Sequence, residues 1–128
     1  MPVREPRELA DAVRAFDADG FQTHLHAIGD AGVRAALDAV EAAARGNPRR
    51  DRRPVTTHVQ LVDPADLPRF AALGVIANAE PLWARPDPPQ TELTVLRLGE
   101  ERASAQCPFA EPAASGARLS FGSDWPGI

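Results

Sequence analysis

The segment Phe21-Gln-Thr-His-Leu-His-Ala-Ile-Gly-Asp30 carries the strongest local signal for the fold. It holds two of the three histidines of the chain, His24 and His26, at alternate positions of a run that breaks at a glycine. Residues two apart in a strand share a face, so both imidazoles point the same way. Asp30 is placed to cap a following helix, and chemistry in α/β folds gathers at such strand ends. Taken alone, the pair is equally typical of polar residues on an edge strand.

On both sides of this segment, helical and strand patterns alternate along the chain. Apolar residues at helical spacing, bounded by glycine, proline or aspartate, predict helices over residues 6–18, 30–45, 64–73, 93–103 and 109–115. Runs rich in β-branched or alternating residues predict strands over residues 21–27, 55–61, 75–79 and 117–121. Four prolines argue against regular structure over residues 81–90. Strands that alternate with helices predict an α/β fold with a parallel sheet of βαβ units.

Composition narrows the functional classes. A chain of 128 residues suffices for one compact domain, and a net charge of −4 argues against a nucleic-acid surface. The one basic cluster, residues 49–53, follows a Gly-Asn-Pro turn and is expected to be a solvated loop rather than a phosphate site. The single cysteine, Cys107, fits a reducing compartment. Because we find neither a signal peptide nor an apolar run of about 20 residues, we expect a soluble, cytoplasmic protein.

Candidate metal ligands follow the predicted strands. His26 ends the first strand, His58 lies late in the second, and Glu80 and Asp124 come just past the third and the last. Because parallel strands end at one edge of a sheet, two imidazoles and a carboxylate would converge there as an N/N/O set suited to Zn²⁺ or a similar divalent ion. Taken singly, His58 is better explained as a core histidine bonded to Gln60 or a threonine, and Asp124 is equally explained as a turn former.

Four segments carry a resemblance to a known family. In chain order they are His24-Leu-His-Ala-Ile-Gly-Asp30, Thr57-His-Val-Gln-Leu-Val-Asp-Pro-Ala-Asp-Leu-Pro-Arg-Phe70, Leu73-Gly-Val-Ile-Ala-Asn78 and Ala117-Arg-Leu-Ser-Phe-Gly-Ser-Asp-Trp-Pro126. Together they resemble the carboxyl-terminal part of amidohydrolase family 3, a branch of the metal-dependent amidohydrolases that includes N-substituted formamide deformylase. The resemblance covers nearly the whole chain. It implies a (β/α)₈ TIM-type barrel, of which residues 1–128 would form a single partial domain holding strands five to eight.

The resemblance also implies roles for particular residues. His26 and His58 correspond to the metal ligands of the fifth and sixth barrel strands. Asp124 corresponds to the aspartate of the eighth strand, which binds metal or moves the proton of the attacking water. The implied activity is hydrolysis of an amide-type C–N bond in a small molecule, and the implied cofactor is a divalent metal, with Zn²⁺ as the expected ion.

Four further residues are assigned to the surroundings of that site. His24 and Gln60 are expected to orient the ligating imidazoles, and His24 is expected to be buried or supporting rather than a direct ligand. Trp83 is expected to line an apolar substrate pocket, with plain packing as the alternative. Glu80 belongs with Trp83 to a tract that looks like the substrate side of the family.

Two departures from the family pattern leave a second function open. Where the family has Ile-Glu-His-Ala-Gln, this chain has Thr56-Thr-His-Val-Gln60, so the acidic residue before the histidine is missing. The amino-terminal His-x-His of the family is also missing, and a barrel needs about 250 residues. The chain is therefore either a piece of a hydrolase or an inactive remnant with a structural or association role. A half barrel would expose two strand edges, which predicts weak metal binding, negligible hydrolysis and homo-oligomers formed through those edges.

Overall fold

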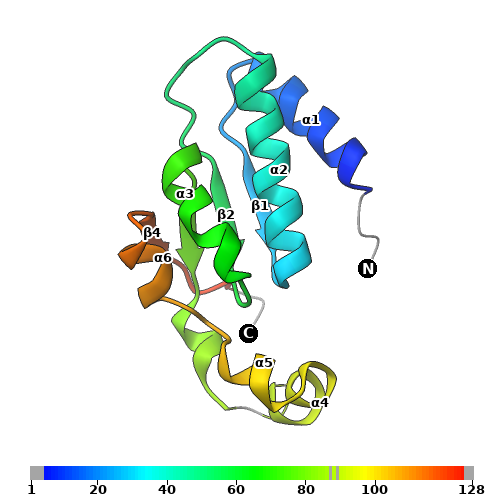
Figure 1. The fold of residues 1–128 in the computed structure, drawn as a ribbon, viewed down its shortest axis with the longest axis vertical. Coiled ribbons are helices and arrows are strands. Elements are labelled where there is room, and N and C mark those ends of the chain that lie inside the picture. Colours follow the sequence, from blue (N-terminus) through cyan, green and yellow to red (C-terminus); the bar gives the residue numbers. More distant parts are fainter. Residues whose placement is uncertain (1–4, 87, 89, 126–128) are drawn as a thin grey trace.

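The computed structural model describes residues 5–86, 88 and 90–125. Four parallel strands form one sheet in the order β1-β2-β3-β4 (Figure 1). Their bounds are β1 His24–Ala27, β2 Val55–His58, β3 Ile76–Ala79 and β4 Arg118–Phe121. Each strand pairs with the next one along the chain, and helices lie between successive strands. The predicted α/β fold with parallel βα units is therefore confirmed, and it is consistent with part of a TIM-type barrel.

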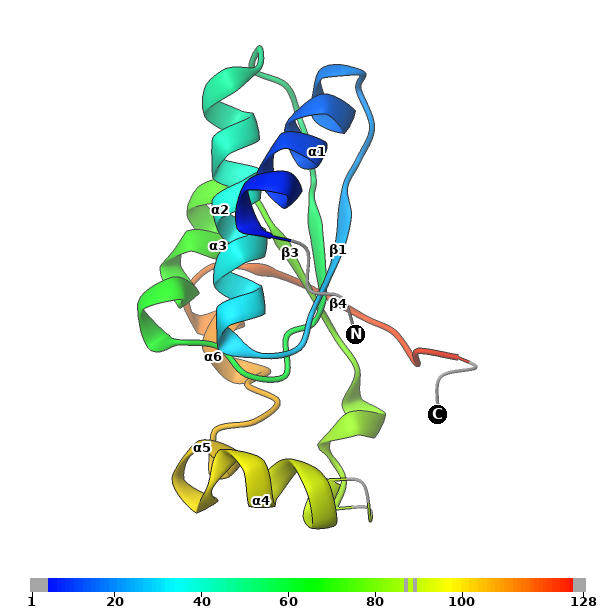
Figure 2. The same cartoon turned by 90° about the vertical axis from the view of Figure 1, so that its right-hand side faces the viewer.

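Helices cover one face of this sheet. Their bounds are α1 Pro6–Ala18, α2 Asp30–Gly46, η1 Pro64–Asp66, α3 Leu67–Leu73, η2 Pro81–Ala84, η3 Gln90–Thr94, α4 Val95–Leu98, α5 Glu100–Ser104 and α6 Ala110–Ala114. Figure 2 shows α1, α2, α3 and α6 on the same side of the strands, whereas α4 and α5 lie beyond the carboxyl ends of the sheet. Within the described part of the chain, no helix is both long and apolar enough to cross a bilayer.

The apolar core lies between the sheet and these helices. Its central side chains, Val33, Leu37 and Phe70, are completely buried and come from α2 and α3. Ala27 and Ala77 face them from the sheet, where small side chains allow the helices to approach closely. The core positions the strands, and the carboxyl ends of the strands in turn position the candidate site.

Some expected element bounds were wrong for identifiable reasons. The helix predicted over residues 93–103 is divided into α4 and α5, because Gly99 adopts φ +77. The proline-rich segment 81–90, in which residues 87 and 89 lie outside the described ones, contains the 3₁₀ turn η2. Pro81 begins that turn, a position where a missing N–H costs nothing. Asp30 is the first residue of α2 rather than its N-cap, which is Gly29.

The basic run at residues 49–53 is not the free loop that its composition predicts. Arg50 and Arg52 both bind the carboxylate of Asp17, at 2.6 and 3.0 Å, and Asn47 donates to it at 2.8 Å. Asp17 lies near the end of α1 and is only 5% exposed. Burial would raise its pKa, but the hydrogen bonds from Asn47, Arg52 and Arg50 hold it below the usual value of 3.8. The run therefore fastens α1 to the loop that leads into β2.

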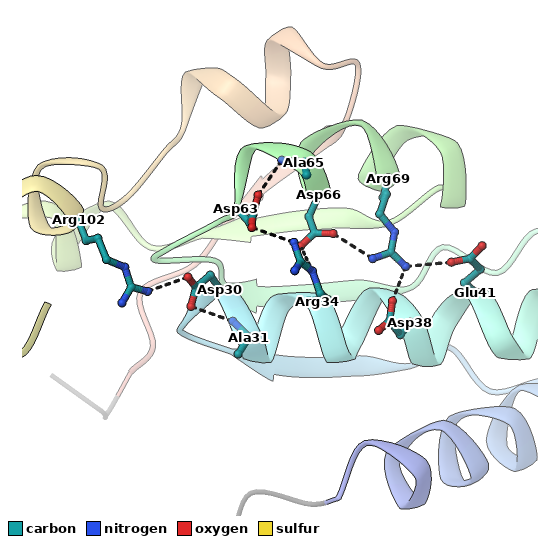
Figure 3. Close-up of polar contacts among 10 residues, drawn as sticks. All are labelled: Asp30, Ala31, Arg34, Asp38, Glu41, Asp63, Ala65, Asp66, Arg69 and Arg102. Atoms are coloured by element: carbon teal, nitrogen blue, oxygen red, sulfur yellow. Dashed lines mark hydrogen bonds and ion pairs between the residues drawn. The ribbon is translucent and has the colours of Figure 1, made fainter.

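A second polar network joins α2 to α3 on the outer surface (Figure 3). Asp66, 3% exposed, accepts from Arg34 at 2.9 Å and from Arg69 at 3.0 Å. Arg34 also reaches Asp63, which caps the 3₁₀ turn before α3 by accepting from the Ala65 N–H. These contacts fix the position of α3 against α2, and through α3 they fix the start of β3.

Candidate metal centre

The inner face of the sheet, which carries no helix in Figure 2, is polar near the carboxyl ends of its strands. The strand register places His26, Thr57, Asn78 and Ser120 side by side, one from each strand. Residues paired in a parallel sheet point to the same face. Barrel interiors are dominated by bulky branched residues, so a polar row at the end where barrel enzymes hold their active sites indicates a functional layer.

His26 and His58 meet at this end of the sheet. His26 Nδ1 lies 2.9 Å from His58 Nε2, and the ring centroids are 4.9 Å apart. Simple strand alternation would direct His58 to the helix side, opposite Thr57. However, His58 has φ +71 and Val59 has φ +46, so the backbone turns at the end of β2. The His58 imidazole is thereby directed to the inner face, next to that of His26.

Two carboxylates lie beside His58. Potential ligand atoms of His58, Glu80 and Asp124 all lie within 4.8 Å of one another. Glu80 is 4% exposed, and its Oε2 lies 2.5 Å from His58 Nδ1. Asp124 is half-buried beyond β4 and has φ +57, which lets the chain turn back towards the strand ends. Pro126, which ends the motif containing Asp124, lies outside the described residues.

The surrounding residues take different positions. His24 is exposed at the free edge of β1 and stacks on His26, with ring centroids 5.7 Å apart. Desolvation, and the charges that His26 and His58 can carry, lower its pKa below 6.5. Gln60 is buried, but its amide donates to Gln106 Oε1 at 2.7 Å rather than to an imidazole. This bond holds the segment after α5 against the end of β2.

Trp83 lies against the site from the 3₁₀ turn after β3. Its ring centroid is 4.7 Å from that of His58, and its Nε1 is buried without a hydrogen-bond partner. The Trp83 backbone N–H donates to the Glu80 carbonyl at 2.9 Å, which fixes the turn. The indole therefore covers one side of the His58 ring and limits the access of water to it.

A polar network behind these residues was not predicted. Thr57 Oγ1 lies 2.9 Å from Glu80 Oε1 and 2.8 Å from Asn78 Oδ1, and Asn78 Nδ2 donates to Ser120 Oγ at 2.8 Å. The available signal was a polar residue at the last position but one of each strand. It becomes informative only once the register of the four strands is known.

The chain belongs to the amidohydrolase family, whose family profile matches residues 1–128. Protein LONG AFTER FAR-RED 3 of Arabidopsis thaliana is 34% identical over 127 residues, which are 98% of this chain and 21% of that protein. The putative amidohydrolase YtcJ of Bacillus subtilis strain 168 is 27% identical over 126 residues, or 98% of this chain and 23% of YtcJ.

The chain is also similar to solved structures of metal-dependent hydrolases. The crystal structure of an uncharacterized metal-dependent hydrolase from Pyrococcus furiosus superposes with a TM-score of 0.74 at 26% identity, over 98% of this chain and 24% of that protein. The chain therefore spans about a fifth to a quarter of the length of these relatives.

Proposed function

We propose that this chain forms strands five to eight of a metal-dependent hydrolase that cleaves amide-type C–N bonds in small molecules. The single observation that carries the proposal is the approach of His26 Nδ1 to His58 Nε2, at 2.9 Å, at the carboxyl end of the sheet. The hydrolase class of the structural relative and the family membership support it. The identity of the bond and the barrel numbering rest on the family resemblance.

The residues present fit a divalent cation. We assign His26, His58 and Asp124 as its ligands, because two imidazole nitrogens and a carboxylate form a donor set that zinc accepts. His58 Nε2 and His26 Nδ1 already face each other, and Asp124 lies in the same cluster as His58. The cluster is enclosed on one side by Trp83, and such enclosure strengthens electrostatic interactions with a cation.

A divalent ion held here would supply Lewis-acid polarisation of a substrate carbonyl and acidification of water. Residues of the chain would transfer the proton and bind the substrate. Asp124 accepts the proton of the attacking water and returns it to the departing nitrogen, first as general base and then as general acid. Trp83 and the neighbouring Leu82, which is 45% exposed, offer an apolar wall to the substrate.

Metal binding by the purified chain tests the ligand assignment. We expect Zn²⁺ to bind at one equivalent in equilibrium dialysis followed by metal analysis. His58→Ala should weaken binding by more than about 100-fold, because loss of a direct ligand exceeds the 10–100-fold effect typical of outer partners. Asp124→Asn should also weaken it, since the amide carries no charge.

His24→Ala is the matched control for His58→Ala. His24 is exposed, stacks on His26 and is not one of the three assigned ligands, so its removal should leave zinc affinity within about threefold of the wild type. The ligand assignment is wrong if the wild-type chain binds no zinc, or if His24→Ala and His58→Ala reduce binding equally.

We also propose that this chain forms homo-oligomers through its open sheet edges. β1 and β4 each pair with a single strand among the described residues, which leaves backbone groups unpaired. Beside β1 lies a groove of about 350 Å³ between α1 and the strand, lined in part by Phe16 and Phe21, which are 57% and 60% exposed. Phe21→Lys should lower the mass measured by light scattering, whereas Leu96→Lys on α4 should not. A wild-type monomer at all concentrations contradicts the proposal.

A further inference from the structure

We propose that Glu80 is a positioning residue that fixes the tautomer of His58, so that Nε2 presents its lone pair to the metal. The inference rests on the proposed function, because it assigns to Glu80 a role in that same site. Glu80 is only 4% exposed, yet both of its carboxylate oxygens have partners. A buried carboxylate whose two oxygens both have hydrogen-bond partners, one of them a candidate metal ligand, is expected to serve the site.

The hydrogen-bond chemistry of the pair determines the tautomer. An ionised carboxylate only accepts hydrogen bonds, so the His58 nitrogen at 2.5 Å from Glu80 Oε2, which is Nδ1, must carry the proton. In a neutral imidazole the other nitrogen then has a free lone pair. That nitrogen, Nε2, is the one that faces His26 at 2.9 Å. Glu80 thus selects the nitrogen of His58 that is available for a cation.

Glu80 is itself held in place from the sheet. Its Oε1 lies 2.9 Å from the hydroxyl of Thr57, which also lies 2.8 Å from Asn78 Oδ1. The Asn78 amide donates to Ser120 Oγ. The Thr57 hydroxyl carries a single proton, so it donates to one of its two neighbouring oxygens at a time, Glu80 Oε1 or Asn78 Oδ1. Because Thr57, Asn78 and Ser120 are paired in register on adjacent strands, the sheet itself fixes the orientation of the carboxylate.

Nitrogen chemical shifts of the metal-free protein test this role without any activity. In ¹⁵N-histidine-labelled chain, we expect His58 to be protonated at Nδ1. Glu80→Leu removes the acceptor, so His58 should redistribute towards the Nε2-protonated tautomer, and zinc affinity should fall by about 10–100-fold. Glu80→Gln retains an oxygen that can accept from Nδ1–H, so it should retain the tautomer and most of the affinity.

Two threonines of β2 provide a matched pair of milder variants. Thr57→Val removes the hydroxyl beside Glu80 and should produce a mixture of His58 tautomers with weaker zinc binding. Thr56→Val is the control, because Thr56 is fully buried on the other face and its hydroxyl has no hydrogen-bond partner. This variant should leave both the tautomer and the affinity unchanged.

The outcomes separate this inference from the proposed function. If Glu80→Leu folds and His58 stays protonated at Nδ1, or if Thr57→Val and Thr56→Val behave alike, the role of Glu80 is overturned. If the tautomer responds as expected but the wild-type chain binds no zinc, the proposed metal site is wrong. Glu80 then fixes the His58 tautomer, but not for metal binding. Dispersed amide spectra of each variant confirm that it remains folded.

Discussion

Replacement of Asp17 by asparagine should destabilise the chain strongly, although Asp17 belongs to α1 and is not part of the candidate metal site. The change retains the size of the side chain and removes its charge. Asp17 has a side-chain exposure of 4%, against 29% for Arg50 and 13% for Arg52. Removal of one partner from a buried ion pair costs about 3–5 kcal/mol, and the partial exposure of Arg50 places this case near the lower end, at about 3 kcal/mol.

Urea denaturation followed by circular dichroism measures this loss. With a urea dependence of about 1–3 kcal/mol per molar, a loss of about 3 kcal/mol lowers the midpoint by about 1–3 M. The matched control is Asp51→Asn, because Asp51 pairs with Arg53 on the surface, where the two side chains are 63% and 61% exposed. No measurable change of the midpoint is expected for the control.

The effect of Asp17 should also depend on pH. Its pKa in the folded chain lies below the usual 3.8, so the carboxylate contributes its stability above that value. The contribution is lost as the pH falls through the folded pKa, because the acid must then be protonated in both states. The difference between wild type and Asp17→Asn should therefore be constant near neutrality and shrink below about pH 4. Equal midpoints at pH 7, or a difference that grows on acidification, would show that the Asp17 carboxylate does not stabilise the fold through its ion pairs.

Two other perturbations probe the core and the segment beyond the sheet. Phe70→Ala removes a completely buried ring and should lower the free energy of unfolding by about 3–5 kcal/mol in the same urea assay; a loss below about 1 kcal/mol would mean that the core is loosely packed. Burial raises the pKa of the Cys107 thiol, so it should react with a thiol reagent more slowly in the native chain than in urea. Equal rates would show that the segment around Cys107 exposes the thiol to solvent in the native chain.

The fold could be predicted because local signals agreed with the long-range structure. The helix predicted over residues 6–18 has those bounds in α1, since Pro6 suits the first helical position and Gly20, at φ +87, suits the turn after it. Gly74, at φ +68, ends α3 in the same way. All four strands were predicted, but each is only four residues long, because a strand extends only as far as its neighbour pairs with it.

The candidate site could be predicted only in part. His26 at the end of one predicted strand, His58 late in the next and Asp124 just past the last were predicted to lie at one edge of the sheet. The structure brings His58 close to both His26 and Asp124. The contact of Thr57 with Glu80 depends on strand register, which no spacing in the sequence reveals. The binding of Arg50 to Asp17 was missed for a similar reason, since the two residues are 33 positions apart and meet only when α1 packs beside α2.

The backbone conformation at the end of β2 accounts for two differences from expectation. The strand ends earlier than predicted, and His58 lies on the same side of the sheet as Thr57. The strand was predicted to continue to residue 61, but it ends at His58, where φ is +71 and the next residue, Val59, has φ +46. A left-handed conformation costs about 1–2 kcal/mol in a residue with a side chain. Val59 is held in it by burial at 4% exposure and by its N–H bond to the Ala27 carbonyl at 3.0 Å. This turn lets neighbouring residues, Thr57 and His58, both reach Glu80, which strand alternation forbids. The strain therefore lies where the site requires it.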